Sequence, residues 1–245
     1  MEKLNYEDAI PIMEGIYWIG FKERSTKLHC NPYLLVDTED VLVFDPGSIP
    51  DFPVIMRKII ETIPPERITH LVLSHQDPDV CGNIAVMEDV IGNDNLQIVC
   101  HINTLRLVRH TGVKSTFYDT CANQNLLTLK SGRRIEFIPA PFLHAPGTIM
   151  TYDHKTKTLF SGDIFGGIGD DWSLYITENY KEEMKLFHQA YMPSNRIMKK
   201  KMEELEKYEI RQILPQHGSI IPQKYVKEAI AYLKELPLAI DLLDT

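Results

Sequence analysis

The sequence LVLSHQDPDVCGN, residues 71–83, decides the fold prediction. Its first residues continue a short apolar run, residues 68–74, which is bounded by turn-forming residues and predicts a buried strand. His75, Asp77 and Asp79 follow directly, so we expect them at the rim of a sheet, where loop side chains converge on ligands. A chain with 9 His and 34 acidic residues contains such a His-x-acid-x-acid pattern by chance about 0.17 times. The local motif is therefore a hypothesis that needs support from the rest of the chain.

Three further segments each place a candidate ligand after an expected strand. They read PAPFLHAPG, TLFSGDIFGG and ILPQHGS, and they supply His144, Asp163 and His217. Each candidate is followed closely by glycine, which lets the backbone turn sharply and leaves room for a metal ion. If these loops follow strands of two facing sheets, all six side chains meet at one edge.

Strand-like and helix-like segments alternate along the chain. Apolar, β-branched segments bounded by turn residues predict strands, and apolar residues at helical spacing predict helices. Two sheet-forming halves, each covered by helices, predict two packed sheets with helices outside. The expected strands are residues 16–20, 33–36, 41–45, 68–74, 96–100, 133–138, 149–152, 158–161 and 211–214, and the expected helices are residues 53–62, 83–91, 101–110, 181–191, 194–208 and 223–236. No linker-like stretch divides the 245 residues, so we expect a single domain, residues 1–245.

The charge and the apolar segments of the chain exclude several classes of partner. The formal net charge is −8, which argues against binding to nucleic acid or to an anionic membrane. The N-terminal residues MEKLNYEDAIP hold no apolar segment of a signal peptide, and no run of about 18 apolar residues could span a bilayer. We therefore expect a cytoplasmic protein. The four cysteines, Cys30, Cys81, Cys100 and Cys121, form no C-x-x-C pair and are expected to be buried free thiols.

The order of the candidate ligands resembles the metallo-β-lactamase superfamily. In that superfamily H-x-[H/E/D]-x-D-H is followed by His, Asp and His, each at a strand end. The similarity extends from the N-terminal strands through LVFDPG, residues 42–47, to the last expected helix. It implies a mixed α/β (α+β) fold, the four-layer αββα metallo-β-lactamase sandwich.

The types of ligand indicate which metal the site selects. Zinc hydrolases of the superfamily have H-x-H-x-D-H, whereas this chain has Asp77 at the second position and Val80 in place of the last histidine. Three histidines and three carboxylates form a more oxygen-rich set than zinc usually selects. The three carboxylates and a bridging hydroxide would together balance the charge of two Fe²⁺ ions. Iron is therefore favoured over zinc.

A carboxylate at position 77 resembles the flavodiiron proteins, which reduce O₂ or NO at a diiron site. The segments LHAPGTIMTYD, TLFSGDIFG and QILPQHGSII are also similar to theirs. The resemblance implies a cofactor of two iron ions with a bridging oxo or hydroxo group. It assigns His75, Asp77 and His144 to one iron, Asp79 and His217 to the other, and Asp163 to the bridge between them.

The chain departs from the flavodiiron pattern in three ways. Asp77 stands where glutamate is usual, and Val80 stands where histidine is usual. The second iron is therefore expected to have an open coordination position, where a small ligand binds. No flavodoxin-like domain follows before Thr245, so we expect no flavin to be bound by this chain.

Stand-alone oxygen-binding diiron proteins lack the flavin domain, are linked to chemotactic sensing, and are similar to this chain. The resemblance implies O₂ binding by a sensor or scavenger. An O₂ or NO reductase with a separate flavoprotein or rubredoxin donor is an alternative, because it needs the same irons. A metal-dependent hydrolase and a metal-free interaction module are further alternatives. The possible protein partners are a chemoreceptor and a second copy of the chain in a homodimer. Histidines outside the motif are expected to be structural or exposed, and His29 is considered for a role beside the ligands.

Overall fold

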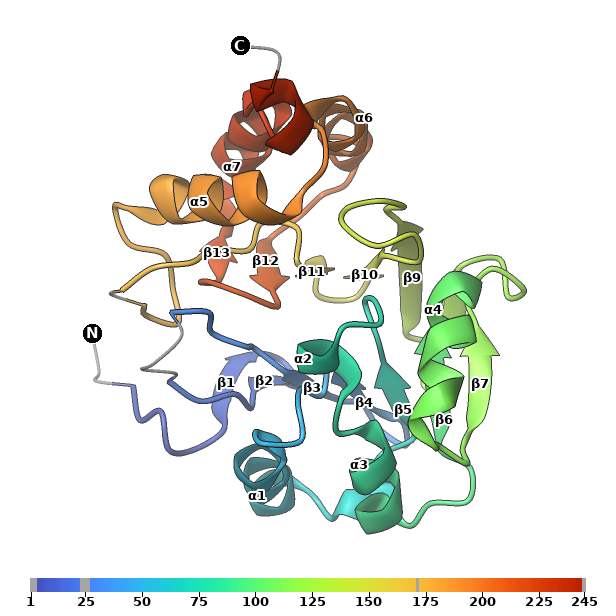
Figure 1. The fold of residues 1–245 in the computed structure, drawn as a ribbon. Coiled ribbons are helices and arrows are strands. Elements are labelled where there is room, and N and C mark those ends of the chain that lie inside the picture. The colour runs from blue at the N-terminus through green and yellow to red at the C-terminus, as the bar shows by residue number, and fades with distance from the viewer. Residues whose placement is uncertain (1–3, 23–26, 171, 244–245) are drawn as a thin grey trace.

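Two β-sheets lie face to face in the computed structural model, which describes residues 4–22, 27–170 and 172–243 (Figure 1). In the first sheet the strand order is β1-β2-β3-β4-β5-β6-β7, and in the second it is β13-β12-β11-β10-β9-β8. The first sheet contains β1 (Ile10–Met13), β2 (Ile16–Trp18), β3 (Tyr33–Val36), β4 (Val41–Phe44), β5 (His70–Val72), β6 (Gln97–Cys100) and β7 (Thr116–Asp119). The second contains β8 (Leu126–Thr128), β9 (Arg134–Pro139), β10 (Ile149–Asp153), β11 (Thr158–Gly162), β12 (Gln212–Pro215) and β13 (Ile221–Pro222).

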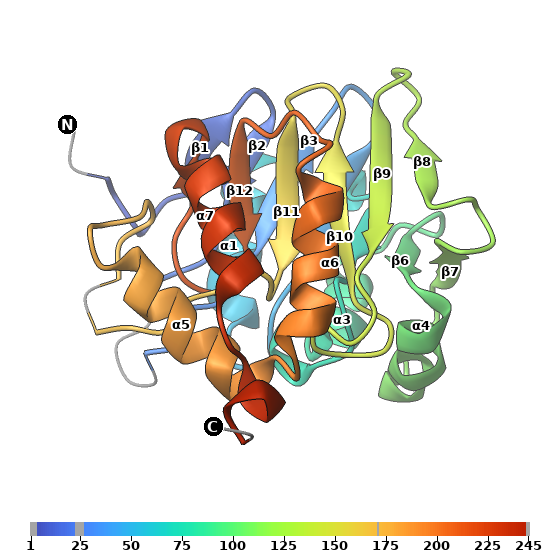
Figure 2. The same ribbon diagram turned by 90° about the horizontal axis from the view of Figure 1, so that it is seen from above.

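Helices cover the outer face of each sheet and complete the four layers of the αββα sandwich. Figure 2 shows α6 and α7 lying across the second sheet. The helices are α1 (Phe52–Thr62), α2 (Pro78–Cys81), α3 (Ile84–Ile91), α4 (Ile102–Val108), α5 (Tyr180–Tyr191), α6 (Asn195–Leu205) and α7 (Gln223–Glu235), with 3₁₀ turns at Pro65–Arg67, Arg109–Thr111 and Ala239–Leu242. None of the helices in the described ranges is long and apolar enough to cross a membrane.

Apolar side chains fill all three spaces between the four layers. One cluster joins the first sheet to α1–α4, and a second joins the second sheet to α5–α7. The third lies between the sheets, where the rings of Phe44 on β4 and Phe160 on β11 stack with centroids 3.9 Å apart. Strands that are buried on both faces carry nearly continuous apolar runs, which is why β4, with the sequence VLVF, is recognisable in the sequence.

The sequence prediction missed mainly strands at the sheet edges. β1, β7 and β8 each end a sheet, and β7 and β8 carry polar side chains that are partly or fully exposed. Edge strands bury less of their surface, so their sequences lack the apolar run that marks a buried strand. The four-residue helix α2 was also missed, because it is too short to show helical periodicity.

Strand direction brings the four loops with candidate ligands to one end of the sandwich. β11 and β12 are parallel, and β9 runs the same way because both β9 and β11 are antiparallel to β10. The loops that follow β9, β11 and β12 therefore all leave the second sheet at the same end of its strands. There they face the loop that follows β5 in the first sheet. Gly162 permits a close approach there, since a Cβ atom at this residue would lie 2.8 Å from the Cβ of Ser74.

Phe160→Ala should lower the free energy of unfolding by about 3–5 kcal/mol, because it leaves a cavity beside Phe44 between the sheets. Leu107→Ala is the control, since this side chain is 56% exposed and its removal should change stability by less than about 0.5 kcal/mol. Chemical denaturation of both variants measures the difference. Equal losses in the two variants would contradict the assignment of Phe160 to the core.

Candidate metal centre

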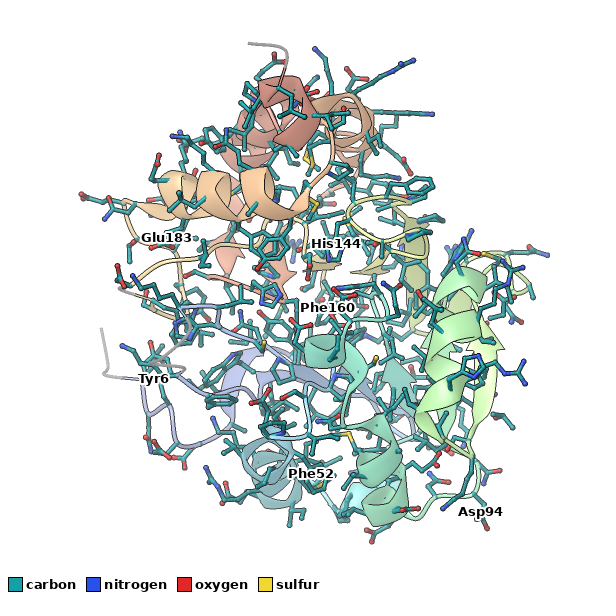
Figure 3. All side chains as sticks on the ribbon, viewed as in Figure 1. Tyr6, Phe52, Asp94, His144, Phe160 and Glu183 are labelled. Atoms are coloured by element: carbon teal, nitrogen blue, oxygen red, sulfur yellow. The ribbon has the colours of Figure 1, made fainter. Side chains whose placement is uncertain are left out.

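The structure brings all six predicted side chains together between the two sheets. His75, Asp77 and Asp79 follow β5, with Asp77 immediately before α2 and Asp79 in its first turn. His144 lies in the loop between β9 and β10, and Asp163 and His217 follow β11 and β12. In Figure 3, His144 lies near the end of α5, in the region between the two halves of the molecule.

Three of the side chains form one half of the site. The ligand atoms of His75, Asp77 and His144 all lie within 4.8 Å of one another. The Asp77 Oδ2 atom is 3.7 Å from His75 Nε2 and 3.4 Å from His144 Nε2. The Asp163 Oδ2 atom faces the same group, 3.6 Å from His75 Nε2 and 3.0 Å from His144 Nε2.

Asp163 also faces the other half of the site. Its second oxygen, Oδ1, is 3.5 Å from His217 Nε2, and that nitrogen is 3.2 Å from Asp79 Oδ2. One carboxylate thus turns one oxygen toward His75 and His144 and the other toward His217. Asp163 therefore contacts both groups of candidate ligands.

Two buried atoms of the site lack a hydrogen-bond partner, and this bears on whether the residues fit a metal ion. Among the described residues, His75 Nε2 and Asp163 Oδ1 are buried side-chain atoms with no hydrogen-bond partner. A buried polar atom without a hydrogen-bond partner destabilises a fold by about 1–3 kcal/mol, and a metal ion bound to each atom would remove that cost. His75 Nε2 lies in the first half of the site and Asp163 Oδ1 faces the second, so each half has a buried donor atom that fits a metal ion.

Neighbouring groups orient the imidazole rings. Ser74 Oγ lies 3.0 Å from His75 Nδ1, and Asp45 accepts a hydrogen bond from the backbone N–H of Ser74. His217 Nδ1 lies 2.9 Å from the backbone oxygen of His29, to which it donates. Because Nδ1 of each ring is occupied in this way, Nε2 is directed into the site. Groups that bind the second nitrogen of a histidine usually orient it as a metal ligand. The expected role of His29 beside the ligands thus falls to its carbonyl group.

Helix α5 places two aromatic rings beside the candidate metal centre, that of Phe187 buried and that of Tyr191 exposed. The ring of Phe187 lies 5.2 Å from the ring of His217, and Tyr191 lies 6.4 Å from His144. His188, on the same helix, is buried and accepts a hydrogen bond from the backbone N–H of Phe165 through Nε2. Burial lowers the pKa of His188 to about 4, so it remains neutral and holds the turn after Asp163. This agrees with a structural role for a histidine outside the motif.

Without metal, the histidine rings and the carboxylates of the site form ion pairs with one another. Burial alone would raise the pKa of the Asp163 carboxyl, but His75 and His217 hold it well below its ordinary value. The imidazole of His75 likewise keeps the pKa of Asp77 low. Burial works to lower the pKa of His75, yet Asp163 and Asp77 raise it to about 9. Protons therefore hold this cluster together without metal, and metal ions must displace them from the rings.

Two residues near the site differ from what the sequence indicated. Val80 is fully buried in the apolar cluster beneath α1 and α3, so a histidine at this position would have to replace apolar contacts. Cys30, expected to be an ordinary buried thiol, has its Sγ atom 4.0 Å from both Asp79 Oδ2 and His217 Nδ1. No sequence signal could have shown this, because Cys30 lies 187 positions from His217. Cys81 and Cys100 are buried as expected, whereas Cys30 is only partly buried and Cys121 is exposed, contrary to the expectation of burial.

The fold and the paired ligand clusters define a metallo-β-lactamase-type protein with a candidate two-metal site. A structure described as the peroxy diiron species of the chemotaxis sensor ODP superposes with a TM-score of 0.79 at 26% identity, covering 96% of this chain and 98% of that one. The apo state of the chemotaxis sensor ODP from T. denticola gives a TM-score of 0.81 at 26% identity, with 96% of each chain covered. The flavodiiron protein from Giardia intestinalis shares the fold, with a TM-score of 0.84 at 24% identity over 96% of this chain and 60% of that one.

A family profile described as ODP family beta lactamase matches residues 28–218, and the chain belongs to this family. A protein from Nostoc sp., provisionally named diflavin flavoprotein A 1, is 31% identical over 184 residues, which are 72% of this chain and 31% of the relative. The nitric oxide reductase of Moorella thermoacetica is 24% identical over 230 residues, 86% of this chain and 57% of the relative. The chain thus spans between about a third and three fifths of these curated relatives.

The metal-free protein should become less stable as the pH rises from about 6.5 to 9. The pKa of His75 is raised from 6.5 to about 9 in the fold, so its protonated ring stabilises the fold fully below pH 6.5 and this contribution is lost through pH 9. Thermal unfolding of chelator-treated protein across this range measures the effect. His75→Gln should reduce the slope and leave the part due to His217, whose pKa is also raised, despite burial, by Asp163, whereas His101→Gln, in a partly exposed ring at the start of α4, should leave the slope unchanged. A wild-type profile that is already flat would contradict the ion-pair description.

Proposed function

We propose that this protein holds two iron ions and binds O₂ at them. In this proposal His75, Asp77 and His144 hold the first iron, Asp79 and His217 hold the second, and Asp163 bridges the two with an oxo or hydroxo group completing the bridge. Two ferrous ions, when bound, supply the electrons that let such a site bind O₂. The chain itself supplies the ligands, their orientation and the apolar surroundings.

The orientation of Asp163 is the observation that carries the proposal. Its two oxygens face two separate groups of donors, at 3.0 Å from His144 Nε2 and at 3.5 Å from His217 Nε2. A two-metal site needs a bridging ligand because its metals lie only about 3.5–4 Å apart. Three carboxylates around such a pair favour iron over zinc, since oxygen donors suit the harder metal.

Binding of O₂ is supported by the relatives that match nearly along their whole length. Both structures of the chemotaxis sensor ODP are covered to at least 96% by this chain, and one is described as a peroxy diiron species. The aromatic rings of Phe187 and Tyr191 beside His217 and His144 suit a small uncharged ligand. In this proposal the domain holds no flavin, and it passes the signal of O₂ binding to a partner such as a chemoreceptor.

A reductase of O₂ or NO is the second candidate. The nitric oxide reductase of Moorella thermoacetica and the anaerobic nitric oxide reductase flavorubredoxin of Pectobacterium carotovorum are relatives, at 24% identity each. This function uses the same six ligands and differs only in the supply of electrons. A separate flavoprotein or rubredoxin would have to deliver them to the site.

Protein prepared with ferrous iron should hold about two iron ions per chain, and Asp163→Ala should lose both. Asp163→Asn retains the shape of the side chain but has a weaker donor, so it should also bind less than one iron. Metal analysis after removal of loose iron measures the content, and circular dichroism shows whether each variant is folded. Asp89→Ala, at an exposed carboxylate, is the control and should retain two. Tight retention of two irons by folded Asp163→Ala would remove the bridge from the proposal.

Sensor and reductase differ in what happens after the first O₂ is bound. The sensor proposal predicts uptake of about one O₂ per two ferrous ions, followed by no further consumption when a reduced rubredoxin or flavoprotein is present. An oxygen electrode and absorption spectroscopy, with and without the donor, measure both quantities. Sustained uptake of O₂ or NO that depends on the donor would favour the reductase. Hydrolysis of a thioester or lactone by a zinc-loaded protein, without O₂ uptake by the iron form, would contradict both.

A further inference from the structure

The two halves of the candidate metal centre have unequal sets of donors. The first half has side chains of His75, Asp77 and His144 together with Asp163 Oδ2. The second half has only Asp79 and His217 from the six predicted ligands, together with Asp163 Oδ1. The position where a histidine is expected in the second half is Val80, which is buried in apolar surroundings.

A cysteine completes the second half. The ligand atoms of Cys30, Asp79 and His217 all lie within 4.8 Å of one another. The same is true of His75, Asp77 and His144 in the first half. The Sγ atom is 4.0 Å from Asp79 Oδ2. An independent feature points into the same space, because Asp163 Oδ1, buried and without a hydrogen-bond partner, lies on this side of the carboxylate.

The residues on either side of Cys30 are bound to the loop of His217. The carbonyl of His29 accepts from His217 Nδ1, and the backbone N–H of Asn31 donates to the carbonyl of Gln216 at 2.8 Å. The Asn31 side chain adds a hydrogen bond of 2.8 Å to the carbonyl of Gly218. Cys30 is therefore held beside His217 from both directions and does not depend on a mobile loop for its position.

We propose that Cys30 is a sulfur ligand of the second metal ion, an inference that rests on the two-metal site proposed above. A metal lies roughly 2.3 Å from thiolate sulfur and about 2.1 Å from carboxylate oxygen, so the two donors are about 3.6 Å apart in a tetrahedral site. The 4.0 Å between Cys30 Sγ and Asp79 Oδ2 needs only a small rotation of either side chain. On binding, the S–H bond breaks, a metal–sulfur bond forms, and the proton leaves to solvent without any change of oxidation state.

A sulfur donor gives the two halves different chemistry. The first half offers two nitrogen and two oxygen donors, and the second offers one sulfur, one nitrogen and two oxygen donors. Thiolate is softer than carboxylate and favours Zn²⁺, Co²⁺ and Fe²⁺ over Mg²⁺ or Mn²⁺. The second half should therefore discriminate more strongly among metals than the first.

Cys81, a buried thiol near the site, provides the comparison with Cys30, which is partly buried. Cys81 lies at the end of α2 and its Sγ atom donates to the carbonyl of Gln76 at 3.2 Å. Burial raises the pKa of both thiols, that of Cys81 to about 12, so the two differ in their neighbours. Cys81 thus has a backbone partner, whereas Cys30 has a carboxylate and an imidazole beside it.

Anaerobic titration of the metal-free protein with Co²⁺ tests the proposal, because a thiolate ligand gives Co²⁺ an intense near-ultraviolet charge-transfer band that nitrogen and oxygen ligands do not give. The band should grow as the second equivalent binds. Cys30→Ser and Cys30→Ala should lose it and weaken the second binding step by at least about tenfold, since even indirect partners of a ligand change affinity by about 10–100-fold. Cys30→Asp should restore much of the affinity without the band.

Control variants separate this proposal from the proposed function. Cys81→Ser and Cys121→Ser should keep both the band and the affinity. Two bound Co²⁺ ions without the band in the wild type would overturn sulfur ligation and leave the two-metal site intact. Failure of the wild type to bind two ions would overturn the two-metal site itself. A band that persists in Cys30→Ala would assign the sulfur to another cysteine and also overturn the proposal.

Discussion

The arrangement of the site depends on one buried carboxylate. Asp163 lies between His75 and His144 on one side and His217 on the other, within 3.0–3.6 Å of all three Nε2 atoms. A buried carboxylate would be strongly unfavourable alone, so these rings, or metal ions in place of their protons, must be close. An arrangement of the two sheets that separated β5 from β11 would remove His75 from this charge and leave it only His144 and His217, which follow strands of its own sheet. The same residue therefore couples the packing of the sheets to the chemistry of the site.

The αββα architecture makes that coupling possible at low structural cost. Its sheets pack through apolar contacts such as the stack of Phe44 on Phe160, and strand direction brings the loops with candidate ligands to one end. Gly162 then lets β11 approach Ser74 at the end of β5, and Ser74 in turn contacts His75. Core packing thus determines the distance between the candidate metal ligands, and none of them needs a long, flexible side chain to reach its partner.

Much of this organisation could be predicted from the sequence, because its signals are local. Buried strands appear as apolar runs, and ligands that directly follow such runs are recognisable with the glycines beside them. The edge strands β7 and β8 could not be found in this way, since partial exposure removes the apolar pattern. Cys30 could not be found either, because its relation to His217 arises from hydrogen bonds between segments 187 positions apart. The bridging orientation of Asp163 came from a resemblance to known proteins, and no spacing in the chain implies it.

The fold also explains why the two halves of the site differ. The first half is built from loops that follow β5 and β9, which belong to different sheets, and it gains a donor from each. In the second half, α2 carries Asp79 into the site, but the next residue, Val80, packs into the apolar layer under α1 and α3. A short helix cannot direct consecutive side chains to the same face, so another segment must supply any further donor. The loop between β2 and β3 lies against the loop of His217 through Asn31, and Cys30 is the residue that this contact places beside Asp79.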